Sequence, residues 1–214
     1  WRRLFPSFGD RPRWCGATPQ FLVPGCREMM LAFAMDASKP YLQKELRSGR
    51  SLLLLPGGTA ELLLTDTSQD TKQVITDRKG FVKLAVQEEA ELVPIVVFGE
   101  KWCYNQVLLP GPIRRFLYLF KIPGTLFVGC FGSLVPGYIR KDKHGYGQPI
   151  KMGVVVGKPI AKPAGAKSEQ DAVDAMHAAY MESMTDIFNR YKARFGYETE
   201  QTWSLVASKK DKAQ

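Results

Sequence analysis

Residues Thr76–Glu100, TDRKGFVKLAVQEEAELVPIVVFGE, join a helix pattern directly to a buried-strand pattern. Asp77 can cap a helix whose apolar positions recur at helical spacing from Phe81 onward, and this helix should end near Ala90. The apolar run Leu92–Phe98 then predicts a buried strand. This stretch therefore indicates an α/β protein.

A second strand of this kind comes earlier, where Leu52–Leu55 ends on the loop 56–61, PGGTAE. Strand, helix and strand form a crossover of the type that places strands parallel. Loops at the carboxyl ends of parallel strands hold ligands. We therefore expect the loop 56–61 and Gly99-Glu100 to leave one sheet at the same edge, as parts of one candidate site.

The glycine loop can offer bare backbone N–H groups at Gly57 and Gly58 to an oxyanion or a phosphate, with Thr59 and Glu61 beside them. Its spacing is neither that of a Walker loop nor GxGxxG. For the loop alone, a structural turn is an equally good interpretation.

Arg78 and Lys79 stand at the start of the predicted helix, where their charge adds to the unpaired N–H groups of the first turn. The pair can meet an anion. The alternative is a solvated face.

Elements outside this region are also predicted. Residues 38–48 read as a short helix that stops at Gly49, residues 65–76 as turn-like, and Met152–Val156 as a strand. A capping box of Ser168 and Asp171 begins a long C-terminal helix that should pack on the sheet and run to Gly196. Its apolar stripe comprises Val173, Met176, His177, Tyr180, Met184, Ile187, Phe188 and Tyr191.

We predict one α/β domain over residues 1–203, with a mixed, largely parallel sheet flanked by helices and closed by the long C-terminal helix. Residues 204–214 should form a mobile basic tail. The chain begins at Trp1 rather than at a methionine, and its first thirty residues lack a clear pattern. We therefore expect the domain to be incomplete at its N-terminus.

The chain is basic, with 30 Lys and Arg against 21 Asp and Glu and a net charge of +9. Such a surface attracts nucleic acid, anionic lipid headgroups or a phosphorylated ligand, and a bland solubilising role is a further alternative. No motif of nucleic-acid binding accompanies the charge, so we expect no nucleic-acid partner. The basic clusters are Arg2-Arg3, Arg11–Arg13, Arg114-Arg115, Arg140-Lys141 with Lys143, and Lys209-Lys210.

Cysteines and histidines add little chemistry. The four cysteines are scattered without a CxxC or a Cys/His cluster, which indicates neither a metal site nor a disulfide framework. Of the two histidines, His177 is more typical of a hydrogen-bonded core residue than of a catalytic base, and His144 of an exposed loop. No nucleophile and base pair can be assembled from the residues present.

An apolar stretch at 116–135, FLYLFKIPGTLFVGCFGSLV, has the length of a membrane-spanning helix. Pro123 and three glycines interrupt it, which favours a helix end followed by a buried strand. Contact with a membrane surface is the intermediate interpretation.

Four ordered blocks carry a resemblance to a known family: PGGTAE at 56–61, the DRKGF to VVFGE block at 77–100, VVVGKPI at 154–160, and MHAAYMESMTDIFNRYKARFG at 176–196. The sequence resembles the type-2 diacylglycerol acyltransferases, which include monoacylglycerol and wax-alcohol acyltransferases. The similarity extends from about residue 20 to about residue 200.

The resemblance implies a glycerolipid acyltransferase-like fold and an acyl-CoA-dependent O-acyltransferase that forms triacylglycerol from diacylglycerol. No bound cofactor is expected, since acyl-CoA is the co-substrate; monoacylglycerol is the other neutral acceptor, and a homo-oligomer is left open. The implied location is the cytosolic face of the endoplasmic reticulum membrane, or a lipid droplet. The motif positions matched here are Gly57, Gly58, Thr59, Glu61, Arg78, Lys79, Gly80, Phe81 and Glu100, with substrate-binding roles.

The family's His-Pro-His-Gly motif, with its histidine base, is absent from these 214 residues. We expect it before Trp1, so that this part alone should be inactive. The chain also departs from the family at 130–132, where Cys-Phe-Gly stands in place of Gly-Arg-Gly.

Two other functions compete with this one. A glycerophosphate-type acyltransferase is the near alternative, but its phosphorylated acceptor would favour an arginine in the glycine loop, where Ala60-Glu61 stand. A non-catalytic domain that binds lipid or a membrane surface, of degenerate acyltransferase origin, is the alternative from a different class.

Overall fold

The structure is a computed structural model of the 214-residue chain. It describes residues 12–16, 26–58, 72–75, 77–113, 125–129, 137, 139–141, 147–197 and 203–206. The helices are α1 (Cys26–Phe33), α2 (Lys39–Arg47), α4 (Gly80–Gln87), η3 (Glu100–Trp102), α6 (Glu169–Tyr191) and η5 (Lys192–Phe195). The strands are β1 (Arg13–Gly16), β2 (Ala34–Asp36), β3 (Leu52–Leu53), β4 (Lys72–Ile75), β5 (Ile95–Phe98), β6 (Asn105–Leu108), β7 (Thr125–Val128), β8 (Ile139–Lys141), β9 (Gly147–Pro149), β10 (Gly153–Val156) and β11 (Trp203–Val206).

The strands form a three-stranded sheet, in the order β2-β1-β3, and four two-stranded ladders. Among the described ladders, β1–β2, β1–β3 and β4–β11 are parallel, whereas β5–β10, β6–β7 and β8–β9 are antiparallel. The prediction of a mixed α/β protein is confirmed. The described ladders do not make the pairing largely parallel.

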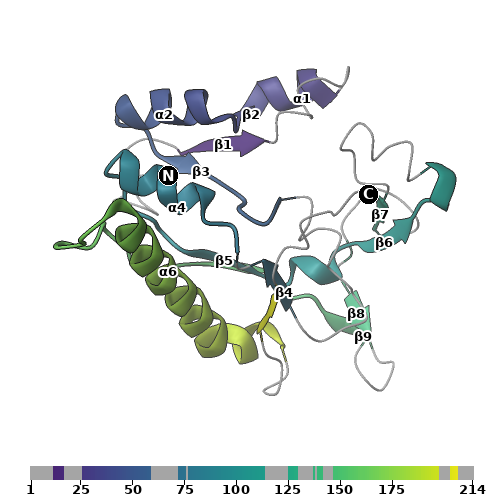
Figure 1. The fold of residues 1–214 in the computed structure, drawn as a ribbon. Coiled ribbons are helices and arrows are strands. Elements are labelled where there is room, and N and C mark those ends of the chain that lie inside the picture. Colours follow the sequence, from purple (N-terminus) through teal and green to yellow (C-terminus); the bar gives the residue numbers. More distant parts are fainter. Residues whose placement is uncertain are drawn as a thin grey trace.

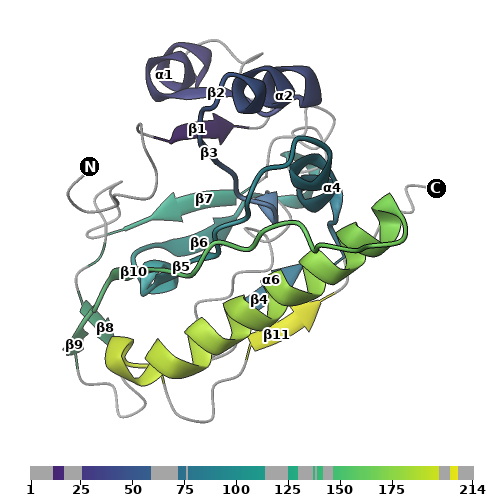
Figure 2. The same ribbon diagram turned by 90° about the vertical axis from the view of Figure 1, so that its left-hand side faces the viewer.

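Helices lie on both sides of the three-stranded sheet. In Figures 1 and 2, β1 lies between α2 and α4, and α6 runs below α4 and β5. Cys15 of β1, Leu42 of α2 and Leu84 of α4 share one buried cluster. Helix α4 is therefore the central layer, with a sheet on one side and α6 on the other.

The long C-terminal helix forms as its sequence predicts. Ser168 caps it, because the Ser168 hydroxyl accepts a hydrogen bond of 3.0 Å from the Asp171 N–H. After a final 3₁₀ turn the helix stops at Gly196, whose φ of 79° favours glycine. Its buried face packs on α4 through Val173 and Met176 and on β5 through Phe188.

The predicted parallel crossover is wrong in its strand partners. Strand β5 pairs with β10 in antiparallel register, with Phe98 opposite Gly153, and not with β3. Among the described strands, β3 has two residues and lies at the edge of its sheet, paired with β1; its residues are half-buried, and Leu55 beyond it is 66% exposed. The predicted full burial of Leu52–Leu55 is therefore wrong.

Helix α4 also differs in its ends. Lys79 occupies the N-cap position, so Asp77 lies too early to cap the helix. The helix ends at Gln87, because Glu88 is the C-cap and Glu89 turns the chain with a φ of 51°. Strand β5 likewise covers Ile95–Phe98 only, and Leu92 makes an isolated bridge with Ile160.

Strands and helices also occur where no pattern predicts them. β1, the centre of its sheet, and α1 lie in the first part of the chain, and β4 lies in the segment expected to be turn-like. β11 pairs with β4, so residues 204–206 of the predicted tail belong to a ladder, while residues 207–214 lie outside the described residues.

Part of the apolar stretch at 116–135 is described. Its residues 125–128 form β7, the strand predicted there, in antiparallel pairing with β6. The rest, apart from Gly129, lies outside the described residues. Within the described part of the chain, no helix combines the length and apolar character needed to cross a bilayer.

Candidate functional site

Residues 56–58, the described part of the glycine loop, form a turn that contacts Arg78; we call it the glycine turn. Arg78 Nη1 donates hydrogen bonds of 3.2 Å to the Pro56 carbonyl oxygen and of 2.9 Å to that of Gly57. Gly57 is buried, and Gly58 has a φ of 51° with its α-carbon facing the guanidinium, since a Cβ added there would lie 3.4 Å from Arg78 Nη1. The sequence pattern does not predict this contact, which brings Arg78 from the start of α4 to the backbone of the glycine loop.

Arg78 keeps donors for a ligand. Among the described residues both hydrogen bonds of its guanidinium are made by Nη1, which leaves Nε and Nη2 to a further acceptor. No carboxylate of the described residues lies within ion-pair distance of this half-buried group. A guanidinium held in place by backbone carbonyls and lacking a carboxylate partner in this part of the molecule is a suitable site for a phosphate or another anion.

Lys79 is used differently. Its Nζ lies 2.6 Å from Asp174 Oδ1 on α6, and both side chains are about half exposed, at 44% and 48%. The hydrogen bond from Lys79 lowers the pKa of Asp174. Lys79 therefore ties the start of α4 to α6, rather than pointing with Arg78 into the glycine turn.

His177 lies one helical turn beyond Asp174 and is half-buried. Burial lowers its pKa first, and the charge of Lys79 lowers it further, while Asp174 acts in the opposite direction. Within the described residues its ring makes no hydrogen bond, so the expected hydrogen-bonded core histidine is only partly correct. His144 lies outside the described residues.

Gly80 and Phe81 open helix α4. Gly80 is exposed and a Cβ there would meet open space. The Phe81 ring meets that of Tyr180 edge-on, with centroids 5.2 Å apart, and packs against the core between α4 and α6. Phe81 therefore fixes the helix that presents Arg78, and its ring faces protein.

Glu100 lies in a separate turn. It begins η3 directly after Gly99, which adopts a φ of 84° and packs against the backbone of Lys151 and Met152. The half-buried Glu100 carboxylate contributes to the raised pKa of the Cys103 thiol, after burial, which is the larger cause. Within the described residues, the strands that precede the two loops, β3 and β5, stand in separate sheets, so the predicted common sheet edge is not found there.

Some of the predicted site residues lie in the part of the chain that the structure describes, and the others lie outside it. Gly57, Gly58 and Arg78 come together, Lys79 and Phe81 face α6, and Glu100 stands in its own turn. Thr59 and Glu61 lie outside the described residues. The sequence did not predict the role of Asp174, because nothing in the pattern of an exposed helical aspartate indicates which cation it will pair with.

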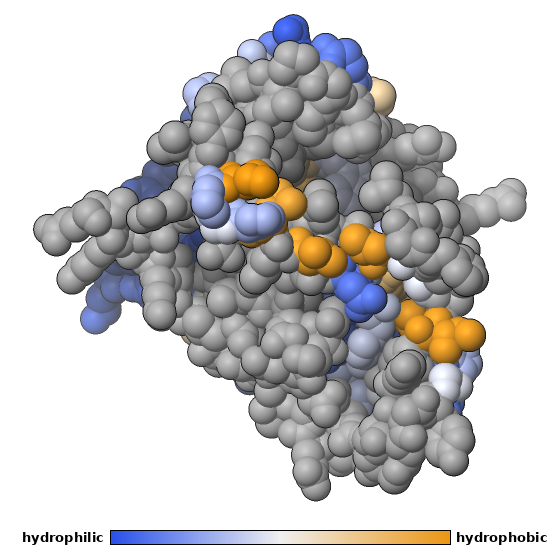
Figure 3. Space-filling view, turned by 90° about the vertical axis from the view of Figure 1, so that its right-hand side faces the viewer, coloured by the Kyte–Doolittle hydropathy of each residue, from blue (hydrophilic) through white to orange (hydrophobic). Residues whose placement is uncertain are grey.

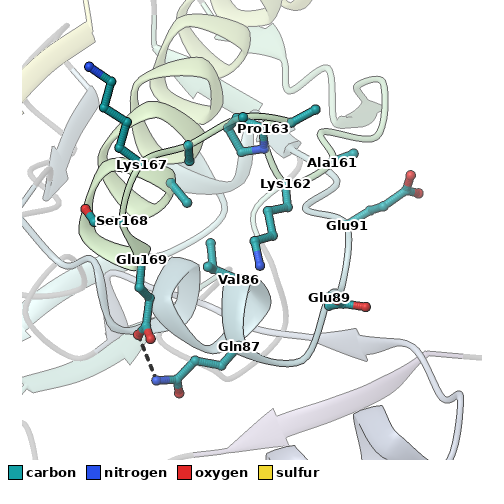
Figure 4. A pocket seen from close by; sticks show the side chains of 14 residues that line it. Val86, Gln87, Glu89, Glu91, Ala161, Lys162, Pro163, Lys167, Ser168 and Glu169 are labelled. Carbon is teal, nitrogen blue, oxygen red and sulfur yellow. Dashed lines mark hydrogen bonds between the residues drawn. The ribbon is translucent and has the colours of Figure 1, made fainter.

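A hollow of about 900 Å³ opens at the other end of α4, shown in Figure 4. It is lined by the end of α4, the loop 161–168 and the start of α6, where Gln87 donates a hydrogen bond of 2.9 Å to Glu169. None of the predicted site residues lines it. An eight-residue helix is about 12 Å long, so this polar hollow is separate from the glycine turn at the opposite end.

Metal and thiol chemistry find no support in the part of the chain that the structure describes. No cluster of three potential metal-ligating side chains occurs among those residues. Cys15 and Cys103 are buried, and burial raises the pKa of each thiol, that of Cys15 to about 11. Neither is an activated nucleophile.

Fold and site define an α/β protein with an arginine-backed glycine turn suited to an anionic group. A family model described as diacylglycerol acyltransferase matches residues 4–206, and the chain therefore belongs to the diacylglycerol acyltransferase family. The resemblance seen in the four sequence blocks is confirmed.

Named relatives agree with this membership. The chain is 32% identical to diacylglycerol O-acyltransferase 2 of Danio rerio, over 94% of the chain and 56% of the relative, and 32% identical to that of Homo sapiens, over 92% and 52%. It is 32% identical to acyl-CoA wax alcohol acyltransferase 1 of Homo sapiens, over 95% of the chain and 62% of the relative. The chain thus spans about half to three fifths of the length of these relatives. No solved structure matches it, and the glycerolipid acyltransferase-like fold stays a prediction.

Proposed function

We propose that the chain is part of an acyl-CoA-dependent O-acyltransferase that forms triacylglycerol from diacylglycerol. In this reaction the acceptor hydroxyl oxygen bonds to the thioester carbonyl carbon, the carbon–sulfur bond breaks, and the hydroxyl proton leaves with the CoA thiol. Membership in the family and the names of the relatives support the reaction class. Acyl-CoA acts as co-substrate, and diacylglycerol or monoacylglycerol is the neutral acceptor.

The observation that carries the proposal is the arginine-backed glycine turn. CoA is rich in phosphate, and Arg78 presents Nε and Nη2 beside the backbone of Gly57 and Gly58. A guanidinium binds phosphate through two parallel N–H donors, and glycine lets a ligand approach the backbone closely. We assign Arg78 to the CoA phosphates, and Glu100 to the wall of the acyl-donor or acceptor pocket.

The base that takes the acceptor proton is not assigned among the described residues. The described residues include His177, which is half-buried on α6 near Asp174 and near Lys79 of the α4 N-cap. The predicted His-Pro-His-Gly motif before Trp1 stays a prediction. It is tested by comparing the 214 residues alone with the same chain extended by its native preceding sequence: turnover by the 214 residues alone would contradict it.

Contact with a membrane surface is part of the proposal. Figure 3 shows hydrophobic residues in an oblique band across the face that carries β6 to β8. By their exposed fractions, Val107 of β6, Ile139 of β8 and Ile113 are open to solvent at 48%, 69% and 50%. Together with the net charge of +9, this band suits an anionic lipid surface. The native location would be the cytosolic face of the endoplasmic reticulum membrane or a lipid droplet.

Vesicle flotation tests the membrane contact. The double change Ile113→Glu and Ile139→Glu should reduce flotation with vesicles containing anionic lipid, because it replaces two exposed aliphatic side chains with carboxylates. The control Tyr41→Glu alters an equally exposed side chain of α2, on the opposite side of the molecule in Figure 1. Equal flotation of both variants and the unaltered protein would contradict this part of the proposal.

Enzyme kinetics test the activity. The extended protein, in membranes from cells that make no triacylglycerol of their own, is given labelled acyl-CoA and diacylglycerol. Arg78→Ala should raise the KM for acyl-CoA about 10- to 100-fold, since a hydrogen-bonded charge is lost from ground-state binding. The matched control is Arg190→Ala, because Arg190 pairs with Asp186 on an exposed face of α6.

Three outcomes decide between the functions. Labelled triacylglycerol, with the KM defect confined to Arg78→Ala, supports the proposal. An unchanged KM removes Arg78 from acyl-CoA binding. Binding of acyl-CoA without any transfer by the extended protein favours the non-catalytic lipid-binding alternative.

A further inference from the structure

The turn that contains Glu100 begins at Gly99, a residue whose backbone conformation must be held by its neighbours. Gly99 has a φ of 84°, and an added Cβ would lie 2.4 Å from the Lys151 carbonyl oxygen, so no other residue fits there without strain. Glycine also has more conformational freedom than other residues, so the direction in which the chain leaves it must be held by neighbours. Glu100 is the next residue, and any rotation about Gly99 moves its carboxylate.

Tyr197 supplies a restraint from far along the chain. Its hydroxyl oxygen accepts a hydrogen bond of 3.1 Å from the Gly99 N–H, and the contact is buried. Tyr197 itself is 3% exposed. A buried backbone N–H requires a partner, and within the described residues this hydroxyl fills that role.

The Tyr197 ring also contacts the rest of the turn. It lies against the Trp102 ring, with centroids 4.6 Å apart, and Lys101 Nζ lies 5.4 Å from its centroid and 5.0 Å from that of Trp102. Lys101 is only 7% exposed, so this cation lies mostly out of water beside two aromatic rings. Tyr197 therefore holds both ends of the turn 99–102.

Tyr197 is itself rigidly placed. It follows Gly196, which ends the last turn of the C-terminal helix, and its ring meets those of Phe98 and Phe188 edge-on at 5.9 and 5.5 Å. Phe98 and Phe188 are fully buried. The hydroxyl is thus fixed by the core between β5 and α6, and can fix the backbone of Gly99 in turn.

We propose that Tyr197 is a positioning residue that sets the direction of the Glu100 carboxylate through its hydrogen bond to the Gly99 N–H. The inference rests on the proposed function, in which Glu100 contacts substrate, and adds a residue from the end of α6 to that site. Tyr197 acts through Glu100 and does not touch the substrate.

The first test is Tyr197→Phe in the extended protein. This change removes the hydroxyl and keeps the ring, so the contacts with Trp102 and Lys101 remain. We expect kcat to fall about tenfold with the KM for acyl-CoA within about twofold, because a small misplacement of a site group can cost up to about 100-fold in rate. The matched control is Tyr191→Phe, since Tyr191 packs in the same aromatic cluster and its hydroxyl has no hydrogen-bond partner among the described residues.

A double-mutant comparison separates positioning from general structure. Tyr197→Phe is repeated in a Glu100→Gln background. If Tyr197 acts through Glu100, the second change should lower kcat less than about twofold further, because the group being positioned is already altered. The full tenfold loss in that background would overturn the proposal, as would a Tyr191→Phe loss equal to that of Tyr197→Phe.

Amide hydrogen exchange provides a readout apart from activity. Tyr197→Phe should speed exchange of the Gly99 N–H at least about tenfold, with little change at the α6 amides, since its buried acceptor is lost. Unchanged exchange at Gly99 would overturn the proposal whatever the kinetics. An inactive unaltered protein refutes the proposed function instead, and a protein that is active but insensitive to Tyr197→Phe refutes only this inference.

Discussion

Replacing Gly153 with alanine should destabilise the protein through one aromatic ring. Gly153 begins β10, opposite Phe98 of β5. An added Cβ would lie 2.2 Å from Cε1 and 2.4 Å from Cζ of Phe195. The Phe195 ring is stacked on Phe98, with centroids 4.6 Å apart and planes at 12°, so it is pressed between the new methyl group and a fully buried partner.

The magnitude follows from the distances. Unbonded carbon atoms rest at about 3.5–4.0 Å, so the ring must move by more than about 1 Å, and this breaks its stack with Phe98. Overpacking of this kind costs about 1–3 kcal/mol, offset by about 0.4–1 kcal/mol from the stiffer unfolded chain. We expect the free energy of unfolding to fall by about 1–2 kcal/mol, and Tm by about 2–4 °C for each kcal/mol.

Urea unfolding followed by circular dichroism measures the change, and two further variants identify its cause. Gly111→Ala is the control, since among the described residues a Cβ there meets nothing within 4 Å. Phe195→Leu should couple to Gly153→Ala by about 1 kcal/mol or more, because a smaller side chain leaves room for the methyl group. A neutral Gly153→Ala, or strict additivity with Phe195→Leu, would refute the reasoning.

Three other predictions concern a cap, a thiol and an ion pair. Ser168→Ala should lower the free energy of unfolding by about 1 kcal/mol, measured by urea unfolding, because the cap of α6 is lost; no loss would contradict that role. At pH 8 Cys15 should resist iodoacetamide in the folded protein and react in urea, since burial raises the pKa of its thiol to about 11. Labelling is measured by mass spectrometry, and rapid labelling of the folded protein would disprove the burial of Cys15. Arg47 donates two hydrogen bonds to Glu88, which lower the pKa of the Glu88 carboxyl below 4.5. The ion pair therefore stabilises the fold above pH 4.5, and this stabilisation is lost as the pH falls through the folded-state pKa. Arg47→Ala should make Tm fall less steeply at acid pH, and an unchanged acid dependence of Tm would contradict this role of the pair.

The sequence predicted single residues of the candidate site, but not which of these residues lie together in the fold. Glycines followed by a charged helix start indicate anion binding, and the contact of Arg78 with the turn at Gly57 agrees with that indication. The sequence did not reveal that Lys79 would turn to Asp174, because a lysine carries the same charge whichever acid it meets. Tyr197 could not be found either, since its partner is a backbone N–H that lies 98 positions away in the chain.

Family membership and the elements that depend on neighbours within one or two turns can be read from the amino-acid pattern alone. Helix α6, with its Ser168 cap and its stop at Gly196, and strand β10 follow from local periodicity and capping, which act between residues three or four positions apart. The pairing of strands emerges only in the folded chain, where β5 pairs with β10 rather than with β3, and β4 pairs with β11. Ladder hydrogen bonds are made by backbone groups that nearly every residue carries, so they do not select a partner. For β5, the position is set by packing against α6.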